Sequence, residues 1–104
     1  MKTWTTPSVE IDVPDGADAL AAASEVVVAA RGRRGVVEKA GSVSGTSVSC
    51  SYTQAETAAL GAGVVEFEVT IALPGGSVLK TDTVCAPIEE AVLRREVGRA
   101  PSED

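Results

Sequence analysis

Residues 52–80 read YTQAETAALGAGVVEFEVTIALPGGSVLK, and this stretch decides how the chain folds. It contains, in order, a helix start signal, a glycine that ends the helix, the longest alternating pattern in the chain and the sharpest turn. Alternation with a period of two is typical of a strand with one buried face. We therefore expect a short helix, a long strand and a hairpin, with the rest of the chain packed around them.

The helix start signal is a capping box. The Thr53 hydroxyl can accept from the amide of Glu56, while the Glu56 carboxylate accepts from the amide of Thr53. Gly61 stands where glycine commonly ends a helix. The pattern predicts a helical turn over about residues 53–60, at which the chain crosses from one sheet to the other. Because a helix of this length is not stable alone, we expect Leu60 to hold it between strands.

The strand pattern occupies residues 63–73 and is the strongest in the chain. A hairpin turn follows at residues 74–76 (Pro-Gly-Gly), and residues 77–86 are predicted to return as the partner strand. Parity turns Cys85 away from the core, which disfavours a disulfide with Cys50, although a bulge would reverse that argument. The side chains expected to face the core are Val65, Phe67, Val69, Ile71, Leu73, Val84, Ala86 and Ile88.

The N-terminal part of the chain begins with a polar arm, residues 1–7, which we expect to be partly ordered. Residues 8–13 alternate and predict a strand, which Pro14-Asp15-Gly16 ends. For residues 17–31 two interpretations remain open. The preferred one is a helical turn in the alanine-rich half, followed by a strand because three β-branched valines are consecutive. The competitor is a single helix over the whole stretch.

The middle of the chain predicts a hairpin loop at residues 32–35 and a short strand at residues 36–40 near a sheet edge, where Glu38 and Lys39 stay solvated. Residues 41–45 (GSVSG) are predicted to be a loop. Residues 46–52 alternate and predict another strand. Its apolar face carries Val48, Cys50 and Tyr52, so that Cys50 behaves as a small core residue.

The C-terminal part is predicted to contain a short helix over residues 88–97, because Glu90 and Arg94 have i,i+4 spacing. Residues 98–104 are polar and are expected to be a disordered tail. Residues 8–97 then form one domain with six or seven strands and a turn signal about every ten residues. This pattern is typical of an all-β fold, an immunoglobulin-like antiparallel sandwich.

Composition and charge argue against several classes of partner. The chain has 104 residues, a net charge of −6 and only three aromatic residues, Trp4, Tyr52 and Phe67. Nucleic-acid binding needs a basic surface, and single-strand or carbohydrate sites use aromatic faces. No apolar segment follows Lys2 as in a signal peptide, and no run is long and apolar enough to span a membrane. We expect an intracellular protein with reduced thiols and no nucleic-acid or membrane partner.

No catalytic, cofactor-binding or metal-binding residues are predicted. The chain has no histidine, and its two cysteines are too few for a zinc site. The acidic pairs Glu66 with Glu68 and Glu10 with Asp12 share strand faces, where solvated side chains are the usual finding. Residues 74–77 lack the spacing and the lysine of a phosphate loop. A last group, Arg31, Arg33 and Arg34, could bind an acidic surface but is more simply a solvated hairpin tip.

The order of these features resembles a family of small proteins encoded among the tail and baseplate genes of phages and prophages of Gram-positive hosts. The resemblance covers about residues 5–97. It includes the start Thr5-Thr6-Pro7, the valine-rich strand and hairpin of residues 25–39, the turn at residues 52–57 (YTQAET) and the segment Lys80-Thr81-Asp82. Two departures are Tyr52, where the family has an aliphatic residue, and Pro87, which interrupts the last strand.

The family looks like immunoglobulin-like sandwiches, similar to the N-terminal domain of phage baseplate upper proteins. The resemblance implies a non-enzymatic structural or assembly protein that contacts other tail or baseplate proteins, or copies of itself. It would be assembled in the host bacterial cytoplasm and then belong to the virion. A host-surface or carbohydrate-binding module on the same sandwich is the alternative. A third hypothesis is a small enzyme or regulator with Cys50 or Cys85 as nucleophile.

Overall fold

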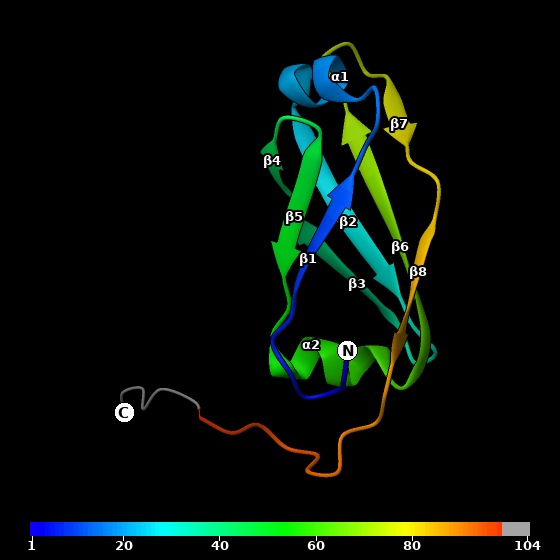
Figure 1. Ribbon diagram of the computed structural model, residues 1–104. Helices are drawn as coiled ribbons and strands as arrows, with labels where there is room; N and C mark the ends of the chain where they lie inside the picture. The colour runs from blue at the N-terminus through cyan, green and yellow to red at the C-terminus, as the bar shows by residue number, and fades with distance from the viewer. Residues whose placement is uncertain (99–104) are drawn as a thin grey trace.

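The computed structural model describes residues 1–98 as two antiparallel sheets packed face to face (Figure 1). The smaller sheet has the order β1 (Ser8–Asp12), β5 (Ser47–Ser51) and β4 (Ser42–Ser44). The larger sheet has the order β3 (Val36–Ala40), β2 (Glu25–Arg31) and β6 (Gly63–Ala72), and both β7 (Val78–Lys80) and β8 (Val84–Ile88) lie along the far edge of β6. Two short helices, α1 (Ala17–Ala22) and α2 (Gln54–Leu60), lie at opposite ends of the sandwich (Figure 1).

The strand order confirms the predicted all-β sandwich. In an immunoglobulin-like sandwich one sheet has the order A-B-E-D and the other the order C′-C-F-G. Here β1, β5 and β4 take the places of B, E and D, while β3, β2, β6 and β8 take those of C′, C, F and G. The helix α2 is the predicted crossover between the two sheets. No described strand stands beside β1 in the place of strand A.

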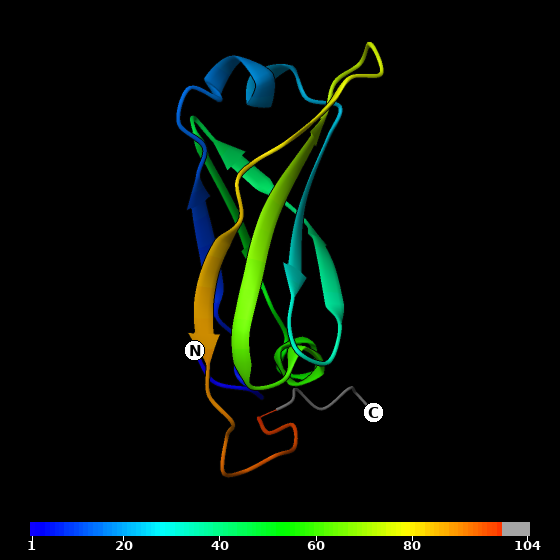
Figure 2. The ribbon, with the colours of Figure 1, turned by 90° about the vertical axis from the view of Figure 1, so that its right-hand side faces the viewer.

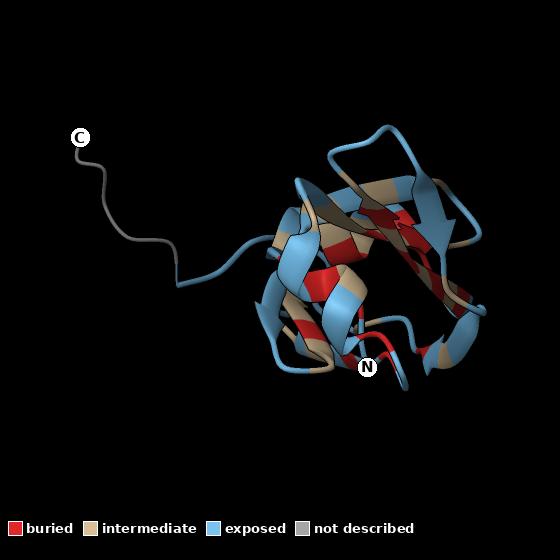
Figure 3. Ribbon diagram, turned by 90° about the horizontal axis from the view of Figure 1, so that it is seen from above, coloured by how far each residue is buried: buried red, intermediate tan, exposed pale blue. Residues whose placement is uncertain are grey.

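The core lies between the two sheets, as the buried residues in Figure 3 show. Strand β6 places every second side chain there, as its alternation predicts. From β2 the buried residues are Val28 and Ala30, so the interpretation of residues 17–31 as a helix followed by a strand is confirmed and the single helix is wrong. The core residues include Ile11, Leu20, Val48, Tyr52, Leu60, Val65, Phe67, Val69, Ile71 and Ile88.

Residues 41–45, predicted to be a loop, contain the short strand β4, which pairs with β5. The predicted return strand at residues 77–86 is interrupted between β7 and β8. At the interruption the Thr81 amide donates to the Val69 carbonyl and the Thr81 hydroxyl accepts from the Val69 amide, both at 3.0 Å. A side chain thus replaces one rung of the ladder and the chain then bulges outward. The split of the return strand and the added β4 give eight strands in residues 1–98 instead of six or seven, and Val84, predicted to be buried, is 48% exposed.

The predicted helix over residues 88–97 is wrong. After β8 the chain is irregular, because Glu89 pairs with the N-terminal segment: the Thr3 amide donates to the Glu89 carbonyl at 2.9 Å, and the Glu89 amide donates to the Met1 carbonyl at 2.8 Å. The Thr3 hydroxyl also accepts from the Ala91 amide. The first of these bonds occupies the Glu89 carbonyl, an acceptor that a helix over residues 88–97 needs, and together they hold the N-terminal segment in place. Residues 99–104, most of the predicted tail, lie outside the described residues.

The helix α2 begins with the predicted capping box. The Thr53 hydroxyl accepts from the Glu56 amide at 3.2 Å, and the Glu56 carboxylate accepts from the Thr53 amide at 2.8 Å. The same carboxylate lies 2.9 Å from the ammonium group of Lys39 in β3, which sequence reasoning placed in solvent. The pKa of Glu56 is lowered by the hydrogen bond from Lys39 and then by that from Thr53. One carboxylate therefore caps the start of the helix and attaches the helix to the larger sheet.

We expect Glu56→Gln to lower the free energy of unfolding by about 0.5–1 kcal/mol at neutral pH, because the ion pair is lost. A carboxyl with a lowered folded-state pKa stabilises the protein above its unfolded pKa, and this contribution is lost as the pH falls through the folded-state value. Urea unfolding at several pH values should show the difference between the two proteins closing in acid. Glu38→Gln is the matched control, because Glu38 is exposed and precedes Lys39 in β3. An equal loss of stability in Glu38→Gln would contradict a stabilising ion pair between Glu56 and Lys39.

The hairpin between β2 and β3 packs closely against the end of α2. A Cβ added to Gly32 would lie 2.3 Å from the Leu60 carbonyl oxygen, whereas one added to Gly35 would lie 3.6 Å from the Ala59 carbonyl oxygen. The Arg34 amide donates to the Leu60 carbonyl at 3.1 Å and satisfies a group at the helix end. Of the two glycines in this loop, Gly32 therefore has no room for a side chain, whereas Gly35 has.

Gly32→Ala should therefore destabilise the protein by about 1–3 kcal/mol, because either the loop or the helix must shift. Gly35→Ala should change the free energy of unfolding by much less. Thermal and urea unfolding of the two variants measure the contrast directly. Equal effects of the two substitutions would show that Gly32 is not held against Leu60.

Candidate functional site

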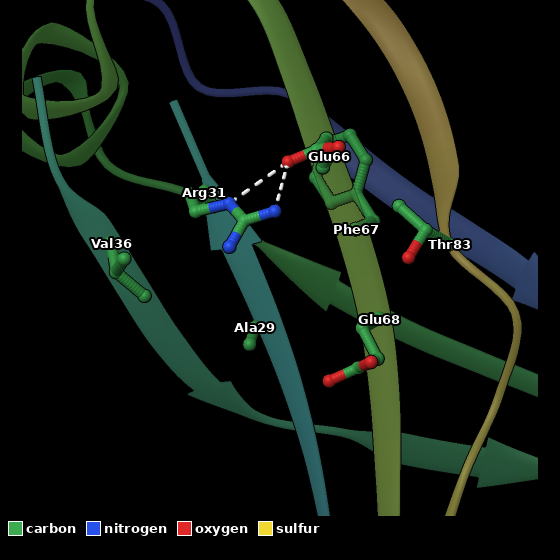
Figure 4. Close-up of a pocket in the computed structure, with 7 residues that line it drawn as sticks. All are labelled: Ala29, Arg31, Val36, Glu66, Phe67, Glu68 and Thr83. Atoms are coloured by element: carbon green, nitrogen blue, oxygen red, sulfur yellow. Dashed lines mark hydrogen bonds and ion pairs between the residues drawn. The ribbon is translucent and has the colours of Figure 1, made fainter. Parts of the chain in front are cut away.

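The outer face of the larger sheet carries a shallow depression of about 170 Å³ (Figure 4). Across it the Arg31 Nε donates to a Glu66 carboxylate oxygen at 2.8 Å, and the Arg31 Nη2 donates to the same oxygen. The hydrogen bond with Glu66, followed by its charge, raises the pKa of Arg31. The depression is lined by Ala29, Arg31, Val36, Glu66, Phe67, Glu68 and Thr83.

The second predicted acidic residue of this face, Glu68, lies two positions further along β6. The ammonium group of Lys80 is 3.7 Å from a Glu68 carboxylate oxygen and donates to the Thr70 hydroxyl at 2.8 Å. The Glu66 and Glu68 side chains are 39% and 38% exposed, so both carboxylates lie beside a basic side chain and in contact with solvent. The two carboxylates therefore belong to two surface ion pairs, one with Arg31 and one with Lys80.

The predicted arginine cluster is divided. Arg31 belongs to the outer sheet face, whereas the side chain of Arg34 lies over Gly61 at the end of α2, where an added Cβ would come within 2.8 Å of it. Arg33 is exposed at the hairpin tip. The remaining acidic pair, Glu10 and Asp12, is exposed on β1, with Asp12 accepting from the Thr46 hydroxyl at 2.9 Å.

A larger groove of about 480 Å³ opens between β1 and the chain that forms β7 and the start of β8. Sequence reasoning did not find it, since it lies between edges of two different sheets. Its only sequence signal is the group of aspartates near the turn after β1. Its lining residues include the apolar Ile11, Val13, Ile71, Leu79 and Val84 and the acidic Asp12, Asp15 and Asp82.

Both cysteines are free. Cys50 is half-buried against the core, while Cys85 is exposed opposite Glu66, as parity predicted. Within residues 1–98, no group of three or more cysteine, aspartate or glutamate side chains is placed to hold a metal ion. In the same part of the chain, neither helix has the length and apolar character needed to cross a membrane.

Two of the buried hydroxyl groups, those of Thr57 and Tyr52, differ in their hydrogen-bond partners. The Thr57 hydroxyl accepts from the Thr5 amide at 3.1 Å and lies 3.0 Å from the Thr5 carbonyl. The Tyr52 hydroxyl has no hydrogen-bond partner among the described residues. Burial is the main reason why the pKa of Tyr52 is raised, and the Cys50 thiol acts in the same direction. A buried tyrosine with a raised pKa stays protonated at neutral pH.

These two hydroxyls give opposite expectations for removal. Thr57→Val should cost about 1–3 kcal/mol, because it leaves the Thr5 amide without its partner. Tyr52→Phe should leave the free energy of unfolding unchanged or raise it by up to about 1 kcal/mol, because it removes an unsatisfied polar group. Urea unfolding of both variants tests the pair. A large loss for Tyr52→Phe would mean that its hydroxyl is bonded in the folded protein.

The chain was compared with profiles of protein families, with curated proteins and with solved structures, and none of them matches it. Its function is therefore proposed from the resemblance of its sequence, from the two concave surfaces and from the unpaired strand edges.

Proposed function

We propose that the chain is a non-enzymatic structural or assembly protein of a phage or prophage tail or baseplate, working through protein–protein contacts. The resemblance of residues 5–97 to small tail and baseplate proteins motivates it. In that role the protein is made in the host bacterial cytoplasm and becomes part of the virion. Its partners are other tail or baseplate proteins, or further copies of itself.

The observation that carries this proposal is the amount of apolar surface left outside the core near strand edges. Val36 and Val64 on the larger sheet are 57% and 62% exposed, and Val92 after β8 is 98% exposed. Exposed apolar surface of this kind is available for contact with another protein. The unpaired edge of β1 adds backbone groups that can pair with another chain. Both features suit assembly.

The second candidate function is a host-surface or carbohydrate-binding module. The aromatic residues argue against it: Tyr52 and Phe67 are each 2% exposed, and Trp4 is half-buried. A sugar site that depends on stacking needs an exposed aromatic face. The groove beside β1 is lined by aliphatic and acidic side chains and offers no such face.

The proposal is tested by mixing the purified chain with the products of the genes that flank its own gene. We expect at least one product, or the chain itself, to form a stable complex seen by co-elution and by cross-linking with mass spectrometry. A glycan array run in parallel should give no saturable binding. A chain that binds neither itself nor any flanking product would remove the support for the proposal, and a saturable glycan signal would favour the second candidate.

A further inference from the structure

The free edge of β1 presents unpaired backbone groups along its length. The Tyr52 amide donates to the Pro7 carbonyl at 3.0 Å, and the Val13 amide donates to the Thr46 carbonyl at 2.7 Å. Because antiparallel pairs alternate between bonded and non-bonded positions, the amide and carbonyl groups of Glu10 and Asp12 point away from β5. They face the place that strand A takes in an immunoglobulin-like sandwich.

The neighbouring edge of the other sheet is closed to a further strand. Glu89 already pairs outward with Met1 and Thr3, so alternation turns Pro87 outward as well. Proline has no amide hydrogen and therefore blocks strand addition at its position. The departure at Pro87 thus protects the edge of β8, whereas β1 has no proline within it and no covering segment among the described residues.

The groove beside the free edge of β1 selects for a particular kind of strand. Its floor is apolar, and Asp12, Asp15 and Asp82 stand on its rim. The one basic residue of its lining, Lys80, is directed to Thr70 and Glu68 on the outer sheet face. The groove therefore suits an extended segment that carries apolar side chains and positive charge.

A segment with these properties lies at the opposite end of the same molecule. Residues 92–96 (VLRRE), here called the arm, run below α2 in Figures 1 and 2. Val92 is 98% exposed and Leu93 is 52% exposed, and both are followed by Arg94 and Arg95. The arm is attached on both sides, at Ala91 by the Thr3 hydroxyl and at Val97 by the side-chain amide of Gln54. Its length equals that of β1, five residues.

We infer that the arm of one copy pairs with the free edge of β1 in a second copy, with Leu93 in the groove and Arg95, on the same strand face, at the acidic rim. The arm and α1, which borders the groove, lie at opposite ends of the molecule (Figure 1), so the contact is head to tail. Pairing of β1 with β1 is disfavoured, because Glu10 and Asp12 would face like charges.

This inference rests on the proposed assembly function and names its partner as a further copy of the chain. A head-to-tail contact uses two different surfaces, so it generates a closed ring or an open filament instead of a symmetric pair. Every copy then has one arm engaged and one groove filled. The two surfaces can therefore be inactivated separately.

The experiment uses two variants of the full chain. The arm variant, Val92→Asp with Leu93→Asp, keeps its groove. The groove variant, Leu79→Lys with Asp82→Lys, keeps its arm. All four side chains are exposed, and thermal unfolding checks that both variants fold like the wild type. Val78→Lys is the matched control, since Val78 neighbours Leu79 in β7 but does not line the groove.

Sedimentation and light scattering over about 1 µM to about 1 mM should show wild-type mass rising with concentration. Association of each variant alone should be weakened by about tenfold or more. Each should therefore remain a monomer of 10.5 kDa at concentrations where the wild type associates. An equimolar mixture should form a one-to-one dimer and nothing larger, because it contains one intact arm and one intact groove per pair. The Val78→Lys protein should assemble like the wild type.

A wild-type chain that is monomeric throughout this range would overturn the inference, and so would assembly that persists in either variant. Persistence in the groove variant would point to pairing of other edges. Failure of the mixture to form dimers would also reject the arm-to-groove contact. A monomer that still binds a product of a flanking gene would reject this inference while leaving the proposed function in place.

Discussion

The sandwich depends on the attachment of α2, where the chain crosses from the smaller to the larger sheet. A helix of seven residues has little stability of its own, and four segments hold this one in place. Glu56 binds Lys39 of β3, and Thr57 binds Thr5 of the N-terminal segment. The amide of Arg34 meets the Leu60 carbonyl, and the Gln54 amide binds the backbone of Val97. Parts of the chain far apart in sequence therefore meet at one end of the molecule.

The opposite end of the sandwich is constructed differently. There the sheets are spanned by α1, and the edge of β1 stands apart from β7 and β8 with a groove between them. The N-terminal segment would be the natural candidate to cover β1 as strand A. It is held instead against Glu89 and α2 by Thr3 and Thr5, at the closed end. Because the N-terminal segment closes the end of the molecule at α2, it does not cover β1, and the edge of β1 stays free beside the groove.

This asymmetry bears on function more than any single side chain does. The acidic pairs and the arginines that could have formed a site of chemistry are surface charge pairs or are divided between elements. What the molecule offers is backbone, apolar side chains and complementary charge on surfaces at its two ends. Those properties suit the proposed assembly role.

The local sequence determined most of the elements. Alternation in β6, the capping box at Thr53 and the consecutive valines of β2 act through neighbouring residues, so they predicted a long strand, a helix and a second strand correctly. The aspartates of the groove and Pro87 are visible in the sequence, but the sequence does not show that they lie beside neighbouring strand edges. Only the tertiary structure decided that Glu89 pairs with residues 1–3 instead of starting a helix, and that Thr81 interrupts the return strand. Those bonds join segments distant in the chain, and no local pattern encodes which backbone group will find a partner there.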